Sequence, residues 1–125
     1  EPIQQLGLDQ SGAALFLTTQ AGVLEHWQVR GLYLAASVVA HQGLVYAMSV
    51  RSDGREVVTA GRDGLVRRWS ALPLAAKVPG QKRNSEFKLL SEIALSNVSA
   101  LAYLGSDVYA GDSLGNLQRV VWPVQ

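Results

Sequence analysis

The fold is decided by residues 41–69, which read HQGLVYAMSVRSDGREVVTAGRDGLVRRW. Two Asp-Gly pairs, Asp53-Gly54 and Asp63-Gly64, divide this stretch, and short apolar runs lie before, between and after them. Asp-Gly between short apolar runs is a strong signal for a tight turn joining two antiparallel strands. The stretch therefore predicts one antiparallel meander with strands at 45–50, 56–60 and 65–69.

The same arrangement recurs on both sides of this stretch. Three pairs of glycines stand ten positions apart with an apolar strand between them: Gly12 and Gly22, Gly54 and Gly64, and Gly105 and Gly115. Five residues past the second glycine stand Trp27, Trp69 and, in the third unit, Val120. The units follow at steps of 42 and 51 residues, so the longer step implies about nine extra residues in one loop. Self-similarity at such a period predicts a repeat architecture with one small sheet per unit.

Residues 41–69 also resemble a WD40 repeat. They carry an opening His, a Ser-Asp-Gly turn, a Thr-Ala-Gly strand end, an Asp-Gly six residues before the Trp, and a His-to-Trp step of 28 positions. The resemblance implies a β-propeller blade and, at one remove, a protein-binding platform. The other units depart from the pattern, because Leu17 and Ala21 take the Thr and Asp places in the first unit, and Ala110 and Leu114 take them in the third. Apolar packing must replace the polar residues there.

The expected fold is all-β, a propeller segment of about three four-stranded antiparallel blades in an incomplete ring. Blade 1 spans about 1–39, blade 2 about 41–94 with an insertion at 71–87, and blade 3 about 97–125 with its outer strand missing. Strands are predicted at 3–8, 14–18, 23–28 and 33–39, at 45–50, 56–60, 65–69 and 88–93, and at 98–103, 107–110 and 116–121. Three blades cannot close a ring, since propellers have about four to eight. The remaining blades would come from the same protein or from another chain, which includes a second copy.

The WD40 resemblance implies a structural tetrad of four hydrogen-bonded side chains: His41, Thr59, Asp63 and Trp69. A buried indole N–H needs an acceptor, a hydroxyl can accept and donate, and a carboxylate fixes the imidazole tautomer. Asp, His and a hydroxyl also form the acyl-transfer constellation. That interpretation is rejected because the hydroxyl would be buried and committed to the indole, so no catalytic residue is predicted.

Two columns of the repeat offer surface candidates. The residues before the Asp place are polar and should be exposed, and two more residues near the start of the middle blade should stand beside them. The candidate partner-binding residues are Gln20, Gln42, Tyr46, Arg62 and Ser113. The second column, just before the Trp place, holds His26, Arg68 and Arg119. We expect these side chains to lie along the blade face with their polar ends in water, rather than to form a basic stripe.

Composition narrows the function. Hydrophobic residues make up 48% of the 125, the net charge is +1, and there are two His and no Cys. No apolar run approaches the roughly 18 residues of a membrane span. We therefore expect a non-catalytic scaffold that docks proteins or peptides, without cofactor, metal or membrane, in the cytoplasm or nucleus. The alternatives are a nucleic-acid-associated propeller subunit, for which the charge is too low, and a quinoprotein-like enzymatic propeller, which residues 109–117 could suggest.

Overall fold

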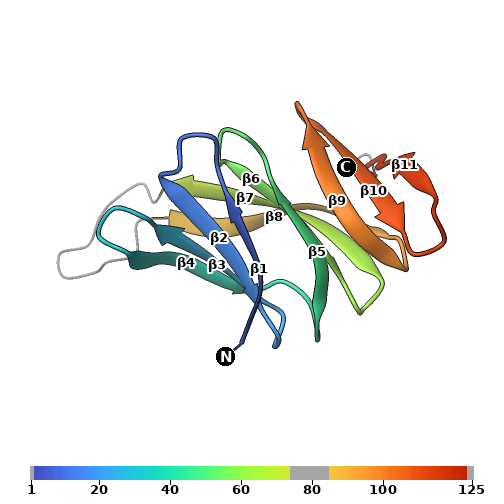
Figure 1. Ribbon diagram of the computed structural model, residues 1–125, viewed down its shortest axis with the longest axis horizontal. Coiled ribbons are helices and arrows are strands. Elements are labelled where there is room, and N and C mark those ends of the chain that lie inside the picture. The colour runs from blue at the N-terminus through green and yellow to red at the C-terminus, as the bar shows by residue number, and fades with distance from the viewer. Residues whose placement is uncertain (1, 74–84, 124–125) are drawn as a thin grey trace.

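A computed structural model of the chain describes residues 2–73 and 85–123 and shows eleven strands there, with no helix among these residues (Figure 1). The strands form three antiparallel sheets, each a meander whose neighbours follow in chain order. The first sheet contains β1 (Ile3–Leu8), β2 (Ala14–Thr19), β3 (Val23–Gln28) and β4 (Tyr33–Val39). The second contains β5 (Val45–Val50), β6 (Glu56–Gly61), β7 (Leu65–Pro73) and β8 (Ser85–Ala94). The third contains β9 (Val98–Leu104), β10 (Asp107–Asp112) and β11 (Leu117–Arg119). The expected all-β propeller segment is confirmed.

Glycine turns set the lengths of these strands. Gly54 and Gly64 adopt positive φ angles of 72° and 82°, which L side chains rarely tolerate, and the other glycines of the three pairs do the same. The ten-residue spacing of the glycines thus reports a fixed strand length between two tight turns.

Strand limits differ from the prediction in two places. The insertion expected at 71–87 is shorter, because β7 runs through Pro73 and β8 starts at Ser85, with Ala71 paired to Phe87. Both of these residues pack in an apolar core, and this burial extends the pairing. Residues 74–84 lie outside the described residues. The last strand, expected at 116–121, is limited to the three residues that pair with β10.

The three sheets pack face to face, with the second sheet between the other two, which lie at opposite ends of the molecule (Figure 1). One apolar core lies between the first and second sheets and includes Phe16, Leu24, Val57 and Trp69. A second core lies between the second and third sheets; its buried members include Val58, Val66, Val98, Val108 and Val120. The first strands β1, β5 and β9 lie next to one another along one side, since β5 contacts both of the others.

Candidate functional site

The structure brings the four side chains of the tetrad together in one chain of hydrogen bonds within the second sheet. Trp69 Nε1 donates to Thr59 Oγ1 at 3.1 Å, and Thr59 Oγ1 lies 2.7 Å from His41 Nε2. His41 Nδ1 lies 3.0 and 3.2 Å from the two carboxylate oxygens of Asp63. Because the indole can only donate, the Thr59 hydroxyl donates to Nε2, and Nδ1 carries the proton that is given to Asp63. Each polar group of these four side chains thus has a hydrogen-bond partner.

Burial and charge favour these protonation states. Burial lowers the pKa of His41, and the hydrogen bond and charge of Asp63 only partly oppose this effect. For Asp63, partial burial alone would raise the pKa, but the His41 hydrogen bond and the backbone N–H groups of Leu65 and Gln42 together hold it below its usual value. His41 is therefore neutral and Asp63 ionised at neutral pH.

Two glycines make room for His41, Gly61 for its ring and Gly22 for its backbone. A Cβ at Gly61 would lie 2.4 Å from Cγ and 2.5 Å from Nδ1 of His41, and a Cβ at Gly22 would lie 2.2 Å from the His41 carbonyl oxygen. Gly22 belongs to the first sheet, and its own carbonyl accepts hydrogen bonds from the backbone of Ala40 and His41. The segment leading into β5 is thus held between two sheets, and the tetrad fixes it to the second.

The other two sheets have no such network. In the first sheet Trp27 is only partly buried and donates to Glu25 Oε1 at 2.9 Å on its own strand. In the third sheet Ala110 and Val120, at the Thr and Trp places, lie in the apolar core, and Leu114, at the Asp place, is exposed. The tetrad is therefore a property of the second sheet within the described residues.

Gln20, Arg62 and Ser113, which precede the Asp place of the repeat, occupy equivalent positions in the three sheets. Each backbone N–H donates to the carbonyl of a residue just before the first strand of its own sheet: Gln20 to Pro2 at 3.1 Å, Arg62 to Leu44 at 2.8 Å and Ser113 to Asn97 at 3.3 Å. All three residues are exposed, and so are Gln42 and Tyr46. The five candidate residues therefore lie at the same end of the sheets.

Tyr46 and Ser113, two of these five residues, line a common pocket. The pocket has a volume of about 330 Å³ and is completed by Asn97, Val98 and Ser99. Tyr46 also lines a second pocket of about 360 Å³, which continues along the first strands past Gln5, Leu6, Met48 and Leu101. The Tyr46 backbone carbonyl accepts a 2.6 Å hydrogen bond from Gln5 Nε2. Tyr46 thus stands between two hollows on a backbone that a neighbouring strand holds in place.

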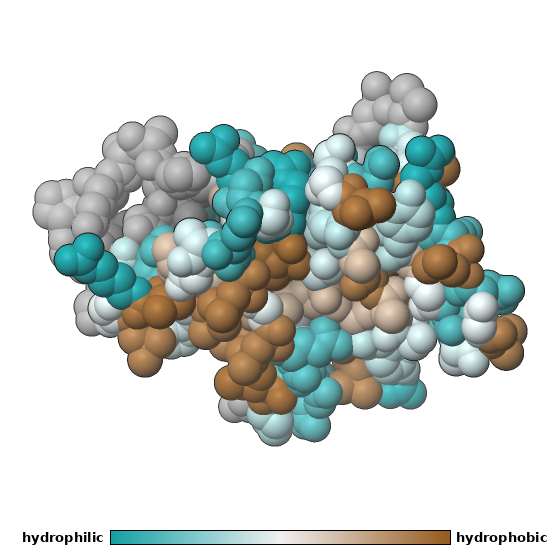
Figure 2. All heavy atoms as spheres, turned by 45° about the horizontal axis from the view of Figure 1, so that its top comes forward, coloured by the Kyte–Doolittle hydropathy of each residue, from teal (hydrophilic) through white to brown (hydrophobic). Residues whose placement is uncertain are grey.

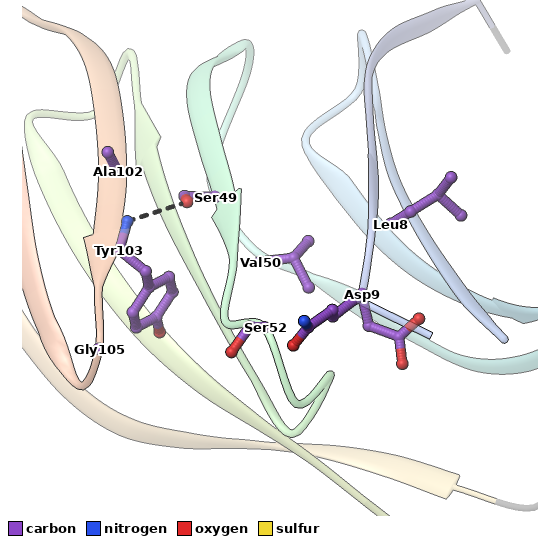
Figure 3. Close-up of a pocket in the computed structure, with 9 residues that line it drawn as sticks. Leu8, Asp9, Ser49, Val50, Ser52, Ala102, Tyr103 and Gly105 are labelled. Carbon is purple, nitrogen blue, oxygen red and sulfur yellow. Dashed lines mark hydrogen bonds between the residues drawn. The ribbon is translucent and has the colours of Figure 1, made fainter. Parts of the chain in front are cut away.

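A polar cluster at the opposite end of the first strands was missed by the sequence reasoning. Arg51 donates to Asp53 at 2.9 and 2.7 Å and to Glu56 at 2.6 Å, and the Tyr103 hydroxyl donates to Glu56 at 3.4 Å. Burial, and next the charge of Glu56, raises the pKa of Tyr103 above its usual value. Tyr103 and Ser49, joined by a backbone-to-hydroxyl bond of 3.2 Å, line a pocket of about 330 Å³ (Figure 3). No spacing rule within one sheet finds this cluster, because Tyr103 belongs to the next sheet.

The column before the Trp place does not behave as expected. The prediction that its polar ends lie in water is wrong for His26, which is buried and stacks on Phe16 with ring centroids 4.7 Å apart. Arg68 is partly buried and lies over the Trp122 ring at 5.4 Å, while Arg119 is exposed. The packing of sheet against sheet covers the first two positions, and this packing cannot be read from one strand.

The described part of the chain contains neither a group of side chains that could hold a metal ion nor a helix that could cross a membrane. Over residues 2–73 and 85–123, His, Asp and Glu side chains form no group of three or more that could hold a metal ion. Among the same residues there is no helix long and apolar enough to cross a membrane.

Comparisons with known proteins identify the fold. The chain is similar to the β-propeller domain of Myceliophteria thermophila Cps50 (Swd1), with 15% identity and a TM-score of 0.71 over 94% of this chain and 35% of that one. It is similar to a chain of the Chaetomium thermophilum polycomb repressive complex 2, with 12% identity and a TM-score of 0.69 over 88% of this chain and 25% of that one. It is also similar to the computationally designed Ika4 protein, with 18% identity and a TM-score of 0.65 over 94% of this chain and 64% of that one.

The chain thus spans about a third, a quarter and just under two thirds of these three chains. No family model matches the sequence, and no curated protein matches it. The resemblance to WD40 propeller blades is therefore confirmed at the level of the fold.

Proposed function

We propose that this chain is part of a larger WD40-type β-propeller that acts as a non-catalytic scaffold and docks a partner protein or peptide through Tyr46. Fold alone does not assign a function, so the proposal depends on the site. The observation that carries it is the position of Tyr46, a half-exposed aromatic residue between two pockets at the end of the sheets where the other candidates also lie.

The chemistry around Tyr46 suits an uncharged stretch of polypeptide. Asn97, Ser99 and Ser113 offer neutral donors and acceptors in one pocket, while Leu6, Met48 and Leu101 offer apolar contacts in the other. Tyrosine is among the residues that most often carry the binding energy of an interface, because its rigid ring fills a pocket and its hydroxyl remains available for a hydrogen bond. A partner side chain in either hollow would contact the Tyr46 ring.

The burial of Thr59 supports a non-catalytic interpretation of the tetrad. A nucleophilic hydroxyl must be reachable by substrate and must be activated by its His. Thr59 is fully buried, and its oxygen already accepts the Trp69 N–H. The tetrad is better suited to holding the loop before β5, and with it Gln42 and Tyr46, in a fixed position.

Assembly with other proteins and an intracellular location belong to the same proposal. One of the similar chains is part of the polycomb repressive complex 2, and we infer for this chain a comparable place as one subunit among several. The lack of cysteine in all 125 residues is in keeping with the cytoplasm or nucleus, where disulfides are rare.

The test is affinity capture with the purified chain, followed by direct binding of the captured protein to Tyr46→Ala. We expect this variant to lose about thirtyfold in affinity, the usual effect at a central tyrosine. The matched control is Tyr109→Ala, which removes a tyrosine that lines neither Tyr46 pocket. Equal binding by the chain, Tyr46→Ala and Tyr109→Ala would show that the site is wrong. Binding to RNA that weakens steeply with salt would favour the nucleic-acid alternative instead.

A further inference from the structure

Three pockets lie in a row along β5, the first strand of the second sheet. The pocket beside Ser113 is at one end of the row, the pocket beside Met48 follows, and the pocket beside Tyr103 is at the other end. Residues 46–50 of β5 all line these pockets, and β1 and β9 line two of them from either side (Figure 3). Together the pockets form one groove, which we call the β5 groove.

The backbone of β5 has an open edge toward this groove. Arg51, which follows β5, donates its N–H to the Glu56 carbonyl at 2.9 Å, so residue 51 is directed at β6. Residues of an antiparallel strand direct their N–H and C=O groups alternately to the two sides of the strand. Met48 and Val50 therefore direct theirs away from β6. Two backbone donors and two acceptors thus face the β5 groove.

Side chains of neighbouring strands already bond to open edges of this kind. Gln5 Nε2 of β1 donates to the Tyr46 carbonyl of β5 at 2.6 Å. Ser49 Oγ of β5 accepts the Tyr103 N–H of β9 at 3.2 Å (Figure 3). Each side chain takes the place of a strand that would pair with this edge. The inner edges of the first strands therefore accept partners from outside their own sheet.

Further blades would leave the β5 groove open. The blades of a propeller surround a central channel, and β1, β5 and β9 lie next to one another along one side of the three sheets. Because β5 belongs to the middle sheet, additional blades would follow β1 or β9 around the channel. They would not stand over β5.

The residues that line the groove favour an uncharged partner. No Lys, Arg or His is among them, and their one carboxylate, that of Asp9, already accepts the Ser11 hydroxyl at 2.9 Å and the Ala14 N–H at 3.2 Å. Residues of intermediate hydropathy, drawn pale, lie in the middle of the side that Figure 2 shows, next to the apolar side chains over the first sheet. The phosphates of a nucleic acid would find no cation in the groove.

We propose that an extended, uncharged segment of the partner lies in the β5 groove and pairs as a strand with β5 through main-chain hydrogen bonds to Met48 and Val50. Strand addition to an open edge takes its affinity from the main chain, which suits a groove without charges. β5 has six residues, so at about 3.3 Å per residue the paired segment would have about six residues and a length of about 20 Å. This pairing rests on the proposed docking function, because Tyr46 stands at one end of the groove.

The probe is a phage-displayed library of random ten-residue peptides, selected on the purified chain. We expect binders with few charged residues, and their affinity should fall with Tyr46→Ala. Val50→Pro removes one N–H of the open edge without removing a bond to β6, and it should weaken binding by about tenfold or more. Val39→Pro is the matched control. Ala40 donates to Gly22, so Val39 also directs its N–H away from the neighbouring strand, and this variant should bind like the unchanged chain. Circular dichroism confirms that the sheets of each variant are intact.

Methylation of the backbone nitrogens of a selected peptide is a second measurement, and it does not depend on the folding of a variant. Each methyl group removes one main-chain donor from the peptide. Only alternate residues of a paired strand face β5, so affinity should fall about tenfold at every second position and little at the positions between.

The results distinguish strand pairing from docking at Tyr46. If Tyr46→Ala weakens binding but neither Val50→Pro nor methylation at alternate positions does, the strand pairing is wrong and docking at Tyr46 stands. If Val50→Pro weakens binding and Tyr46→Ala does not, the pairing stands and Tyr46 is not the docking residue. A library without binders, binders selected for their charge, or a single-stranded RNA that displaces the peptides would each overturn the proposal.

Discussion

Trp27 and Trp69 stand at the same place in two neighbouring sheets, but their surroundings differ. Trp69 is buried between the sheets and donates to Thr59, which in turn is bonded to His41 and through it to Asp63. Trp27 is partly buried and donates to Glu25 two residues earlier on its own strand. The first arrangement joins two strands and a loop, whereas the second joins a strand to itself.

The two tryptophans differ in their hydrogen bonds because the neighbouring strand of each sheet carries different residues beside them. Thr59 of the second sheet corresponds to Leu17 of the first, and Gly61 corresponds to Thr19, since Gly61 and Thr19 each pair with the first residue of their sheet's first strand. A leucine offers the indole no acceptor, so Trp27 uses Glu25. Both sheets therefore carry a tryptophan at the same place, but the residues around it decide whether the tryptophan also holds a loop in position.

The largest effect should come from Gly61→Ala. The new Cβ would lie 2.4 to 2.7 Å from three atoms of His41, which is buried and hydrogen-bonded at both ring nitrogens. Because the ring cannot move without breaking the tetrad, we expect the free energy of unfolding to fall by about 3 kcal/mol or more. Urea unfolding followed by circular dichroism measures it.

Gly111→Ala is the matched control for this substitution. Its Cβ would meet Ala100 at 3.8 Å, an ordinary contact, so the change should be neutral or slightly stabilising through the unfolded chain. If Gly61→Ala lowers the free energy of unfolding by less than about 1 kcal/mol, the His41 ring is not held tightly against Gly61. The glycine in the second sheet, where the first sheet has Thr19, would then not be explained by the His41 ring.

Much of the fold could be predicted from the sequence because turns and alternation are local signals. Asp53-Gly54 and Asp63-Gly64 delimit β6, and the spacing of Gly12 from Gly22 delimits β2 in the same way. Contacts between sheets could not be predicted, because no local pattern says which strand lies opposite. His26 was expected at the surface and lies against Phe16 and Phe87, and the bond of Tyr103 to Glu56 joins residues 47 positions apart.

The candidate surface was predicted in part for the same reason. Gln20, Arg62 and Ser113 occupy equivalent turns, as the repeat implies, and this follows from the glycine spacing alone. The pocket that joins Tyr46 to Ser113 depends on how the second and third sheets pack, and so does the second pocket beside Tyr46. Their roles in docking remain a prediction.

A second, smaller effect should separate the two tryptophans. Thr59→Val removes the hydroxyl while keeping the shape of the side chain, so the buried Trp69 N–H loses its acceptor and His41 loses its donor. We expect a loss of about 2 kcal/mol in the free energy of unfolding, together with faster hydrogen exchange of the Trp69 indole by NMR. Glu25→Met is the comparison in the first sheet, because it likewise removes the acceptor of the indole N–H; Trp27 is only partly buried, so water can replace the lost bond and the variant should cost less than about 1 kcal/mol. Similar losses for both variants would mean that the two networks are equivalent.

The smallest effect concerns pH, because each of the two sheets buries one histidine. Burial lowers the pKa of His41 and also that of His26, where the charge of Asp9 only partly opposes it. Below the usual value of 6.5 the unfolded chain therefore binds protons that the folded chain does not, so stability is complete above that pH and is lost as the pH falls through it. The slope of the free energy of unfolding against pH can reach about 1.4 kcal/mol per pH unit for each histidine.

Urea unfolding at pH values above and below 6.5 measures this slope. His26→Leu should remove the part of the slope that His26 contributes and leave the part that His41 contributes. An unchanged slope in His26→Leu would show that the stacked ring on Phe16 titrates as freely in the folded chain as in the unfolded one, and that only the tetrad of the second sheet responds to acid.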